Sequence, residues 1–219
     1  MVLDNYRTTL DWWLVPLAKA FRRVNPDVFT WMSLVVAAVG GLAFYKSDAT
    51  PTGLKLLLVA WACVLLNSVL DLLDGKVAKL TGKATARGDY LDHSIDRFSD
   101  VLFVLGIAFS PWARLEIGVL ALTGTLLTSY MGTQAQAIGL KRNYAGLLGR
   151  ADRMVLMLII PIADYVWVRE GFAAPWQPTF HSLLELMLAY FALMGVLTTG
   201  QRFIAGLRGF DRDGKIKPN

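Results

Sequence analysis

The sequence is poor in cysteine, in histidine and in charge. Its 219 residues include one cysteine, Cys63, and two histidines. A lone cysteine excludes a disulfide within the chain, and because Cys63 lies in an apolar stretch we interpret it as a buried, inert thiol. Charged residues make up only 18% of the chain. Internal repeats, low-complexity stretches and linkers are also absent, so we expect a single domain over residues 1–219.

The sequence is rich in long apolar stretches. Hydrophobic residues account for 55% of the chain, and its mean hydropathy of +0.46 lies on the apolar side of soluble domains. Each stretch is close to the roughly 20 residues that cross a bilayer core. We therefore predict an all-α, polytopic protein of the cell membrane, with six transmembrane helices at about 27–46, 54–73, 90–110, 115–138, 153–169 and 180–206.

An interfacial amphipathic helix is expected before the first span, over residues 3–23. Apolar side chains recur there at helical spacing, and Arg22 and Arg23 form a basic flank. An ordinary solvated helix that caps the bundle is the alternative. We expect no signal peptide, because charged residues such as Asp4 and Asp11 interrupt the apolar run.

The distribution of basic residues predicts the orientation in the membrane. Eighteen of the 22 Lys and Arg residues belong to the N-terminal segment, the 2–3 and 4–5 connections with their flanks, and the C-terminal segment. By the positive-inside rule, both termini and the 2–3 connection face the cytoplasm. The net charge of +5 then reflects topology and contact with anionic membrane lipids, and we expect no nucleic-acid partner. The other four basic residues are Lys46, Lys55, Arg114 and Arg169.

Four carboxylates lie where the second and third spans meet. Asp71 and Asp74 are three residues apart, and Asp92 and Asp96 are four apart, so each pair shares one face of a helix. If the two helices form a hairpin, all four converge, and unpaired carboxylates at that distance would repel one another. One or two divalent cations would keep them ionised, and an all-oxygen set suits Mg²⁺ or Mn²⁺ and not zinc. A salt-bridge cluster is the alternative, but few cations are near in the sequence.

This spacing resembles the signature of the CDP-alcohol phosphotransferases, D-x2-D-G-x2-A-R-x8-G-x3-D-x3-D. The usual Arg after the Ala is Lys79 here, which keeps the charge but loses the bidentate fork. Residues 16–30, PLAKAFRRVNPDVFT, are similar to the start of the first span in the nearest members, which make phosphatidylinositol phosphate or archaetidylinositol phosphate. The signature is otherwise matched by Asp71, Asp74, Gly75, Ala78, Gly88, Asp92 and Asp96.

The resemblance implies a reaction of phospholipid biosynthesis. A phosphatidyl-type group passes from a CDP-lipid to an alcohol acceptor and CMP is released, with the help of two Mg²⁺ ions, or of Mn²⁺. It implies a homodimer, with Asp96 as the catalytic base. The metal ligands it implies are Asp71, Asp74 and Asp92, with Asp96 as a further ligand. The contacts to the CDP substrate include Asp27, Val28, Phe29, Thr30 and Asp74.

Small and polar residues beside the acids complete the predicted site for the CDP substrate. Gly75 and Ala78 let a bulky group approach the helix backbone, or merely serve helix packing. Lys79 can reach a phosphate. Thr85 can donate its hydroxyl to a phosphate or to its own loop, and Gly88 leaves room for a close neighbour at the start of the third span.

The acceptor is inferred from basic residues further along the chain. In members that accept inositol phosphate, basic residues of the fourth, fifth and sixth spans bind the phosphate of the acceptor. Arg150 and Arg202 stand at matching places in the last two, whereas Gly132 and Gln134 replace the basic residues of the fourth. We expect a phosphorylated acceptor, inositol phosphate or glycerol phosphate. A neutral or zwitterionic alcohol is the alternative, and Arg150 could instead be a positive-inside anchor.

Two other classes of function are open at this point. A cation transporter could also use an intramembrane carboxylate site, although a cation path does not require Gly75, Ala78 and Lys79 beside it. A scaffold protein of the membrane would leave the acids without a role. Release of CMP from a CDP-lipid in the presence of Mg²⁺ separates the enzyme from both.

Overall fold

The computed structural model describes residues 11–140, 146–172, 179–211 and 216. Over these residues the chain is all-α, with an isolated bridge between Phe210 and Ile216 as the only β pairing. The helices in the described part of the chain are α1 (Asp11–Ala20), α2 (Pro26–Lys46), α3 (Pro51–Leu80), α4 (Ala86–Ala108), α5 (Leu115–Ala137), α6 (Arg150–Glu170) and α7 (Leu183–Arg208).

Local capping sets the first residues of three of these helices. The side chains of Asn25, Thr50 and Thr85 each accept a hydrogen bond from a backbone N–H two or three residues further on. Pro26 and Pro51 follow the first two caps, at the helical position where a missing N–H costs nothing. The chain therefore enters α2, α3 and α4 at positions fixed by its own sequence.

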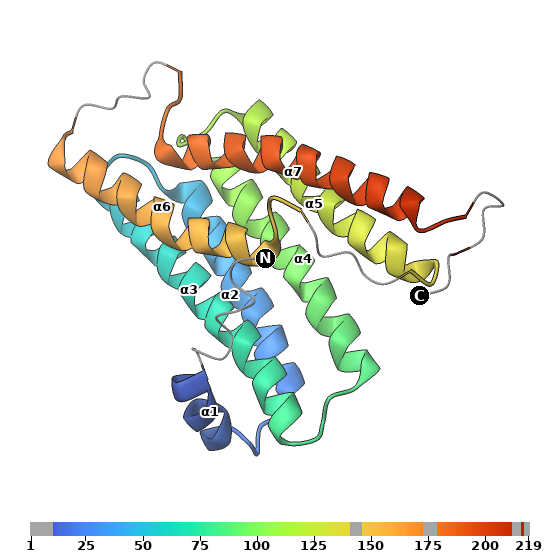
Figure 1. The fold of residues 1–219 in the computed structure, drawn as a ribbon. Helices are drawn as coiled ribbons and strands as arrows, with labels where there is room; N and C mark the ends of the chain where they lie inside the picture. The colour runs from blue at the N-terminus through green and yellow to red at the C-terminus, as the bar shows by residue number, and fades with distance from the viewer. Residues whose placement is uncertain (1–10, 141–145, 173–178, 212–215, 217–219) are drawn as a thin grey trace.

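The long helices form two groups that share one core. The first group consists of α2, α3 and α4, which pack together along their lengths. The second group consists of α5 and α7, which run side by side across the upper end of the first (Figure 1). Helix α6 lies against α3 and α7. Fully buried side chains such as Phe44, Phe103, Met157 and Phe191 join the two groups. The end of α3 packs with α1 and the start of α2 in a second, smaller core, formed by Ala18, Phe29, Leu70, Leu73 and Val77.

Two helices differ in extent from the sequence prediction. The second span is predicted at 54–73, whereas α3 runs from Pro51 to Leu80, so Asp74 as well as Asp71 lies within the helix, as their predicted shared helix face requires. For the N-terminal helix predicted over 3–23, the structure describes Asp11–Ala20, and residues 1–10 lie outside the described part.

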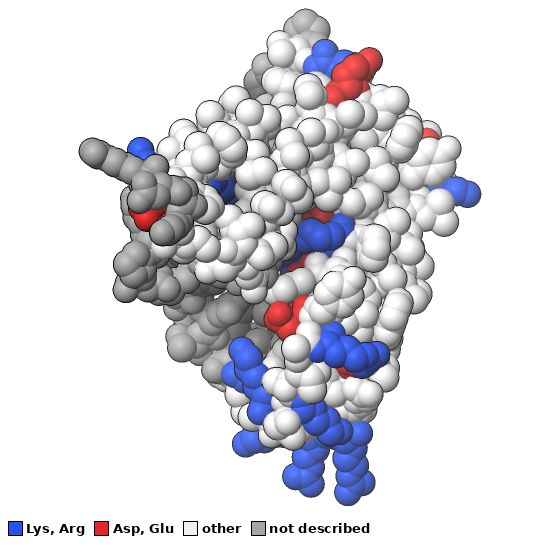
Figure 2. All heavy atoms as spheres, turned by 90° about the vertical axis from the view of Figure 1, so that its right-hand side faces the viewer, with Lys and Arg blue, Asp and Glu red and all other residues white. Residues whose placement is uncertain are grey.

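Within the described part of the chain, four helices are long and apolar enough to cross a membrane, namely α2, α3, α5 and α7. On α2, large apolar side chains point outward at helical spacing, among them Val35, which is 64% exposed, and Leu42, which is 56% exposed. The face of the molecule in Figure 2 is likewise mostly uncharged, with Lys and Arg gathered at its lower end. These features confirm a polytopic membrane protein, whereas the prediction of six spans is confirmed only in part.

Glycines bring the helices of each group into backbone contact. A Cβ on Gly195 of α7 would lie 2.8 Å from the backbone of Gly124 in α5. A Cβ on Gly106 of α4 would lie 2.3 Å from the carbonyl oxygen of Gly41 in α2. Small residues allow such close approach in membrane proteins, where packing and not the hydrophobic effect drives helix association.

We expect Gly195→Val to destabilise the protein by about 1–3 kcal/mol, because the new side chain must push α5 and α7 apart. The matched control is Gly200→Val in the same helix, where an added Cβ would meet nothing within 4 Å. Thermal unfolding in detergent compares the two variants. Equal midpoints would contradict the proposed close contact.

Candidate active site

The four acids of the signature come together beside the connection from α3 to α4. Asp71 and Asp74 lie on the last turns of α3, and Asp92 and Asp96 on the first turns of α4. The Asp71 carboxylate is close enough to those of Asp74, Asp92 and Asp96 for electrostatic repulsion between them. Oxygens of Asp92 and Asp96 and a ring nitrogen of His93 lie within 4.8 Å of one another.

The start of α2 lies against this acidic group. Thr30 donates its hydroxyl to Oδ2 of Asp74 at 2.7 Å, and both residues are buried. Phe29 is buried as well, Val28 is exposed, and Asp27 forms an ion pair with Arg87 of α4. Of the four residues of this segment assigned to the CDP substrate, the structure therefore brings Thr30 into direct contact with an acid.

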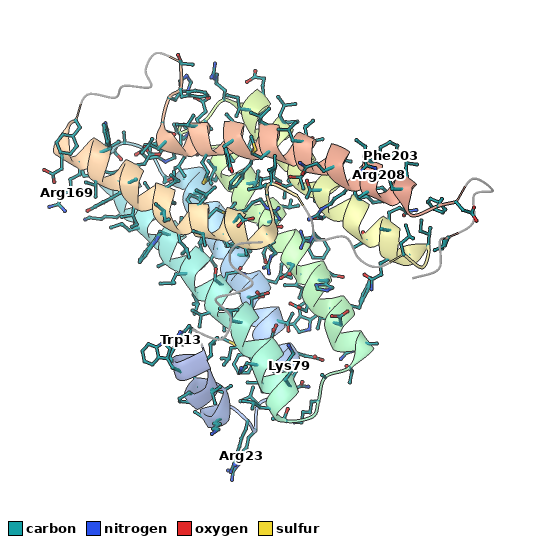
Figure 3. All side chains as sticks on the ribbon, in the orientation of Figure 1. Trp13, Arg23, Lys79, Arg169, Phe203 and Arg208 are labelled. Carbon is teal, nitrogen blue, oxygen red and sulfur yellow. The ribbon has the colours of Figure 1, made fainter. Side chains whose placement is uncertain are left out.

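The remaining residues assigned to the CDP substrate lie along the exposed edge of the α3–α4 hairpin. A Cβ on Gly75 would meet nothing within 4 Å, so this face of α3 is open. Ala78 is half-buried, and Lys79 is exposed at the end of the molecule that also carries Arg23 (Figure 3). The Thr85 hydroxyl oxygen caps α4 by accepting a hydrogen bond from the N–H of Gly88 at 3.1 Å, and the group to which Thr85 donates its proton stays a prediction.

Arg150, the first residue of α6, contacts the acids directly. Its Nη1 donates to the two carboxylate oxygens of Asp71 at 3.0 and 3.1 Å, and its Nη2 lies 2.7 Å from Oδ1 of Asp96. A guanidinium with several donors in a fixed plane suits oxyanions of this kind. One side chain therefore joins α6 to both α3 and α4.

A buried ion network behind Arg150 is not predicted from the sequence. Asp100, which is 1% exposed, accepts hydrogen bonds from Arg153 Nη2 at 2.7 Å and from Arg97 Nη1 at 3.1 Å. Nε of Arg150 lies 3.9 Å from the other oxygen of Asp100. Asp100 follows Asp96 by four residues, so it continues the acidic face of α4 by one turn. This spacing is the feature of the sequence from which its place near the site could have been predicted.

The second predicted acceptor residue, Arg202, is buried where α7 packs against α5. Its Nη1 donates to the carbonyl oxygen of Thr128 at 2.6 Å. Gly132 follows Thr128 by one helical turn and is also buried, whereas Gln134 is exposed. The small residue at position 132 therefore lies on the packed face of α5.

A half-open groove of about 290 Å³ lies between α4 and α5. Arg97 spans it and donates to the hydroxyl of Ser129. The groove reaches the acids through His93, which follows Asp92 directly. Its lining residues are His93, Arg97, Leu126, Ser129, Tyr130 and Thr133.

The donors of the site fit a divalent cation such as Mg²⁺ or Mn²⁺. They are carboxylate oxygens from two helices, the ligand type that these ions prefer. The Asp92 side chain is 35% exposed, and its oxygen lies 3.9 Å from the His93 ring. Its carboxylate is therefore accessible beside the more buried acids, as a shared metal site requires.

The fold matches solved structures of one enzyme. It superimposes on the phosphatidylinositol phosphate synthase of Mycobacterium tuberculosis with CDP-DAG bound, with a TM-score of 0.69 at 23% identity over 89% of this chain and 93% of that chain. The same enzyme in complex with manganese and citrate gives a TM-score of 0.71 at 22% identity, over 89% of this chain and 88% of that chain. At these identities the likeness concerns the fold.

Sequence comparisons extend the likeness to the family. The archaetidylinositol phosphate synthase of Methanothermobacter thermautotrophicus is 28% identical over 203 residues, or 93% of each chain. The phosphatidylinositol phosphate synthase of Mycobacterium tuberculosis is 32% identical over 197 residues, which cover 85% of this chain and 82% of that one. The model of the CDP-alcohol phosphatidyltransferase family matches residues 23–198. The chain therefore belongs to the CDP-alcohol phosphatidyltransferase family.

Proposed function

We propose that this enzyme transfers a phosphatidyl-type group from a CDP-lipid to a phosphorylated alcohol and releases CMP, with inositol phosphate as the favoured acceptor. The observation that carries the proposal is the meeting of Arg150 from α6 with the acids of α3 and α4, at contacts of 2.7 to 3.1 Å. The site thus combines carboxylates for a metal with an arginine for an oxyanion. The names of the relatives, which are inositol phosphate lipid synthases, support this acceptor.

We assign the metal to Asp71, Asp74 and Asp92, with Asp96 as a further ligand, and expect two Mg²⁺ ions. When bound, such ions stabilise the charge of a transferring phosphoryl group and of its leaving group. The chemistry of the donor set supports this assignment, and so does the manganese in one structure of a relative. Thr30 would hold Asp74 in place through its hydroxyl.

Asp96 is the residue that we assign as the base. It is buried, and the guanidinium of Arg150 fixes one of its oxygens at 2.7 Å. Its second oxygen is then the one that can accept the proton of the incoming hydroxyl, provided that the acceptor lies within hydrogen-bond reach. Arg150 would thereby orient the base and the phosphate of the acceptor from the same side.

We expect Asp71→Asn, Asp74→Asn and Asp92→Asn to weaken Mn²⁺ binding and activity together. Asp96→Asn should still bind the CDP-lipid and the Mn²⁺ held by Asp71, Asp74 and Asp92, but its turnover should fall by at least about 100-fold because the base is lost. Electron paramagnetic resonance measures the bound Mn²⁺, and CMP release measures turnover. The matched control is Asp89→Asn on the same helix, where the side chain is 70% exposed. If metal-loaded Asp96→Asn turns over at a rate near that of the unmodified enzyme, Asp96 is not the base.

The acceptor assignment rests on Arg150 and Arg202. Arg202→Ala should remove a charge-assisted contact of about 1.5–3 kcal/mol and raise the acceptor KM by roughly 10- to 150-fold. Arg150→Ala should raise the acceptor KM as well and should also lower turnover, because Arg150 holds Asp71 and Asp96. The KM for the CDP-lipid should change little, and inorganic phosphate should compete with the acceptor. Initial rates against both substrates test this, with Arg208→Ala, exposed on the same helix, as the control.

A neutral or zwitterionic acceptor is the alternative for the same chemistry. Gly132 and Gln134 favour it, because they add no positive charge to α5. In that case the acceptor KM would be the same in the Arg202→Ala variant as in the unmodified enzyme, and phosphate would not compete. The metal-dependent release of CMP would be unaffected by that outcome.

We also propose that α4 and α6 cross the membrane, which gives six spans with the site and both termini on the cytoplasmic side. These helices have 23 and 21 residues, enough for a bilayer core of roughly 20. Their charged first turns belong to the site and so need not contact lipid. Basic residues at the end marked by Arg23 and Lys79 in Figure 3 support the orientation. A homodimer rests on the family resemblance alone.

This orientation predicts which cysteines an impermeant maleimide can reach. In a chain with Cys63→Ala, a cysteine introduced by Lys83→Cys in the exposed α3–α4 loop should react only after the cells are permeabilised. The control is Glu170→Cys at the far end of α6, which should react in intact cells. Labelling of Lys83→Cys in intact cells would show that the orientation is opposite to the proposed one.

A further inference from the structure

A single buried hydroxyl fixes the segment before α6 to α7. Thr198 of α7 is fully buried, and its Oγ1 accepts hydrogen bonds from the N–H groups of Leu147 at 3.2 Å and of Leu148 at 3.1 Å. The chain approaches Thr198 through Gly146, which has a φ of +140°. A Cβ on Gly146 would lie 2.2 Å from Cγ2 of Thr198, so the close approach requires glycine.

The backbone is also fixed at the next residue. The N–H of Gly149 donates to Oδ2 of Asp152 at 2.8 Å, and Leu148 is buried in the main core. Three successive N–H groups before Arg150 therefore have partners, two of them supplied by Thr198. These hydrogen bonds hold residues 147–149 in place directly before α6 begins at Arg150.

The two arginines of the proposed acceptor site depend on the same face of α7. Arg150 follows the fixed segment directly and reaches Asp71 and Asp96. Arg202 follows Thr198 by four residues, so it lies one turn further along the same face of α7. Helix α7 therefore carries both Thr198, which fixes the segment before Arg150, and Arg202.

We propose that Thr198 is a positioning residue for the acceptor. Its two hydrogen bonds set the place of Arg150 relative to Arg202, so that both guanidinium groups bind one phosphorylated acceptor. The inference rests on the proposed function, because it assumes that the arginines bind the acceptor. Thr198 acts only through the backbone of residues 147–148 and the start of α6. Its loss should therefore change acceptor binding more than CDP-lipid binding.

The test uses the full-length enzyme and the isosteric variant Thr198→Val. This variant keeps the shape of the side chain but removes Oγ1, which accepts the two backbone hydrogen bonds. We expect the acceptor KM to rise roughly 5- to 20-fold, with an unchanged KM for the CDP-lipid. Thr198→Ser, which keeps the hydroxyl, should restore the acceptor KM. Thr123→Val is the control, since that hydroxyl is exposed and bonds only within α5. Should Thr198→Val fail to fold, Thr198→Ala carries the same expectation.

A double-mutant cycle separates positioning from general stabilisation. In the Arg150→Ala background, Thr198→Val should raise the acceptor KM no further, because it acts through the side chain that is already absent. Independent, multiplying effects would overturn the inference, and so would equal effects on both substrates. If Arg150→Ala raises the acceptor KM and Thr198→Val does not, only the positioning role fails. If Arg150→Ala itself has no effect, the acceptor assignment fails first.

Discussion

Charge placed at the edge of a membrane must find a partner within the protein, and this requirement organises the molecule. Asp71 and Asp96 share Arg150, Asp74 takes the hydroxyl of Thr30, and Asp100 holds Arg153. Each of these pairs joins two different helices. Removing one partner of a buried pair leaves an uncompensated charge, which is far more costly than the pair itself. The contacts that build the site are therefore also contacts that hold α2, α3, α4 and α6 together.

The sequence predicts the parts of the site that depend on helix period alone. Acids three or four residues apart share a helix face whatever surrounds them, so the two acidic pairs could be found without the structure. Their partners could not be found in this way, because the contacts of Arg150 span 79 residues to Asp71 and depend on how the helices pack. Thr198 gave no signal at all, since a threonine in an apolar helix is ordinary until its neighbours are known.

The limits of the helices illustrate a second reason for incomplete prediction. Hydropathy indicates where a chain can contact lipid, but a helix can continue beyond that point. In α3, Leu73 is the last residue of the predicted span and Val77 follows it by about one turn. Both are buried with Phe29 and Ala18, so the helix persists to Leu80. Conversely, α4 begins with the charged residues of the site, which lowers its hydropathy although its length resembles that of the other long helices.

The length of α3 relates the site to the thickness of the bilayer. Its 30 residues extend about 45 Å, and Asp71, 20 residues after Pro51, lies about 30 Å from its start, close to the depth of a hydrocarbon core. In a membrane whose hydrocarbon core α3 enters at Pro51 and crosses along the normal, the carboxylates would stand at the level where lipid phosphates begin, and the last turns would project into water. A bilayer thicker or thinner by one helical turn would present the diphosphate of its lipid to a different turn of α3. The distance from Pro51 to Asp71 along α3 therefore relates access to the lipid phosphate to the thickness of the hydrocarbon core.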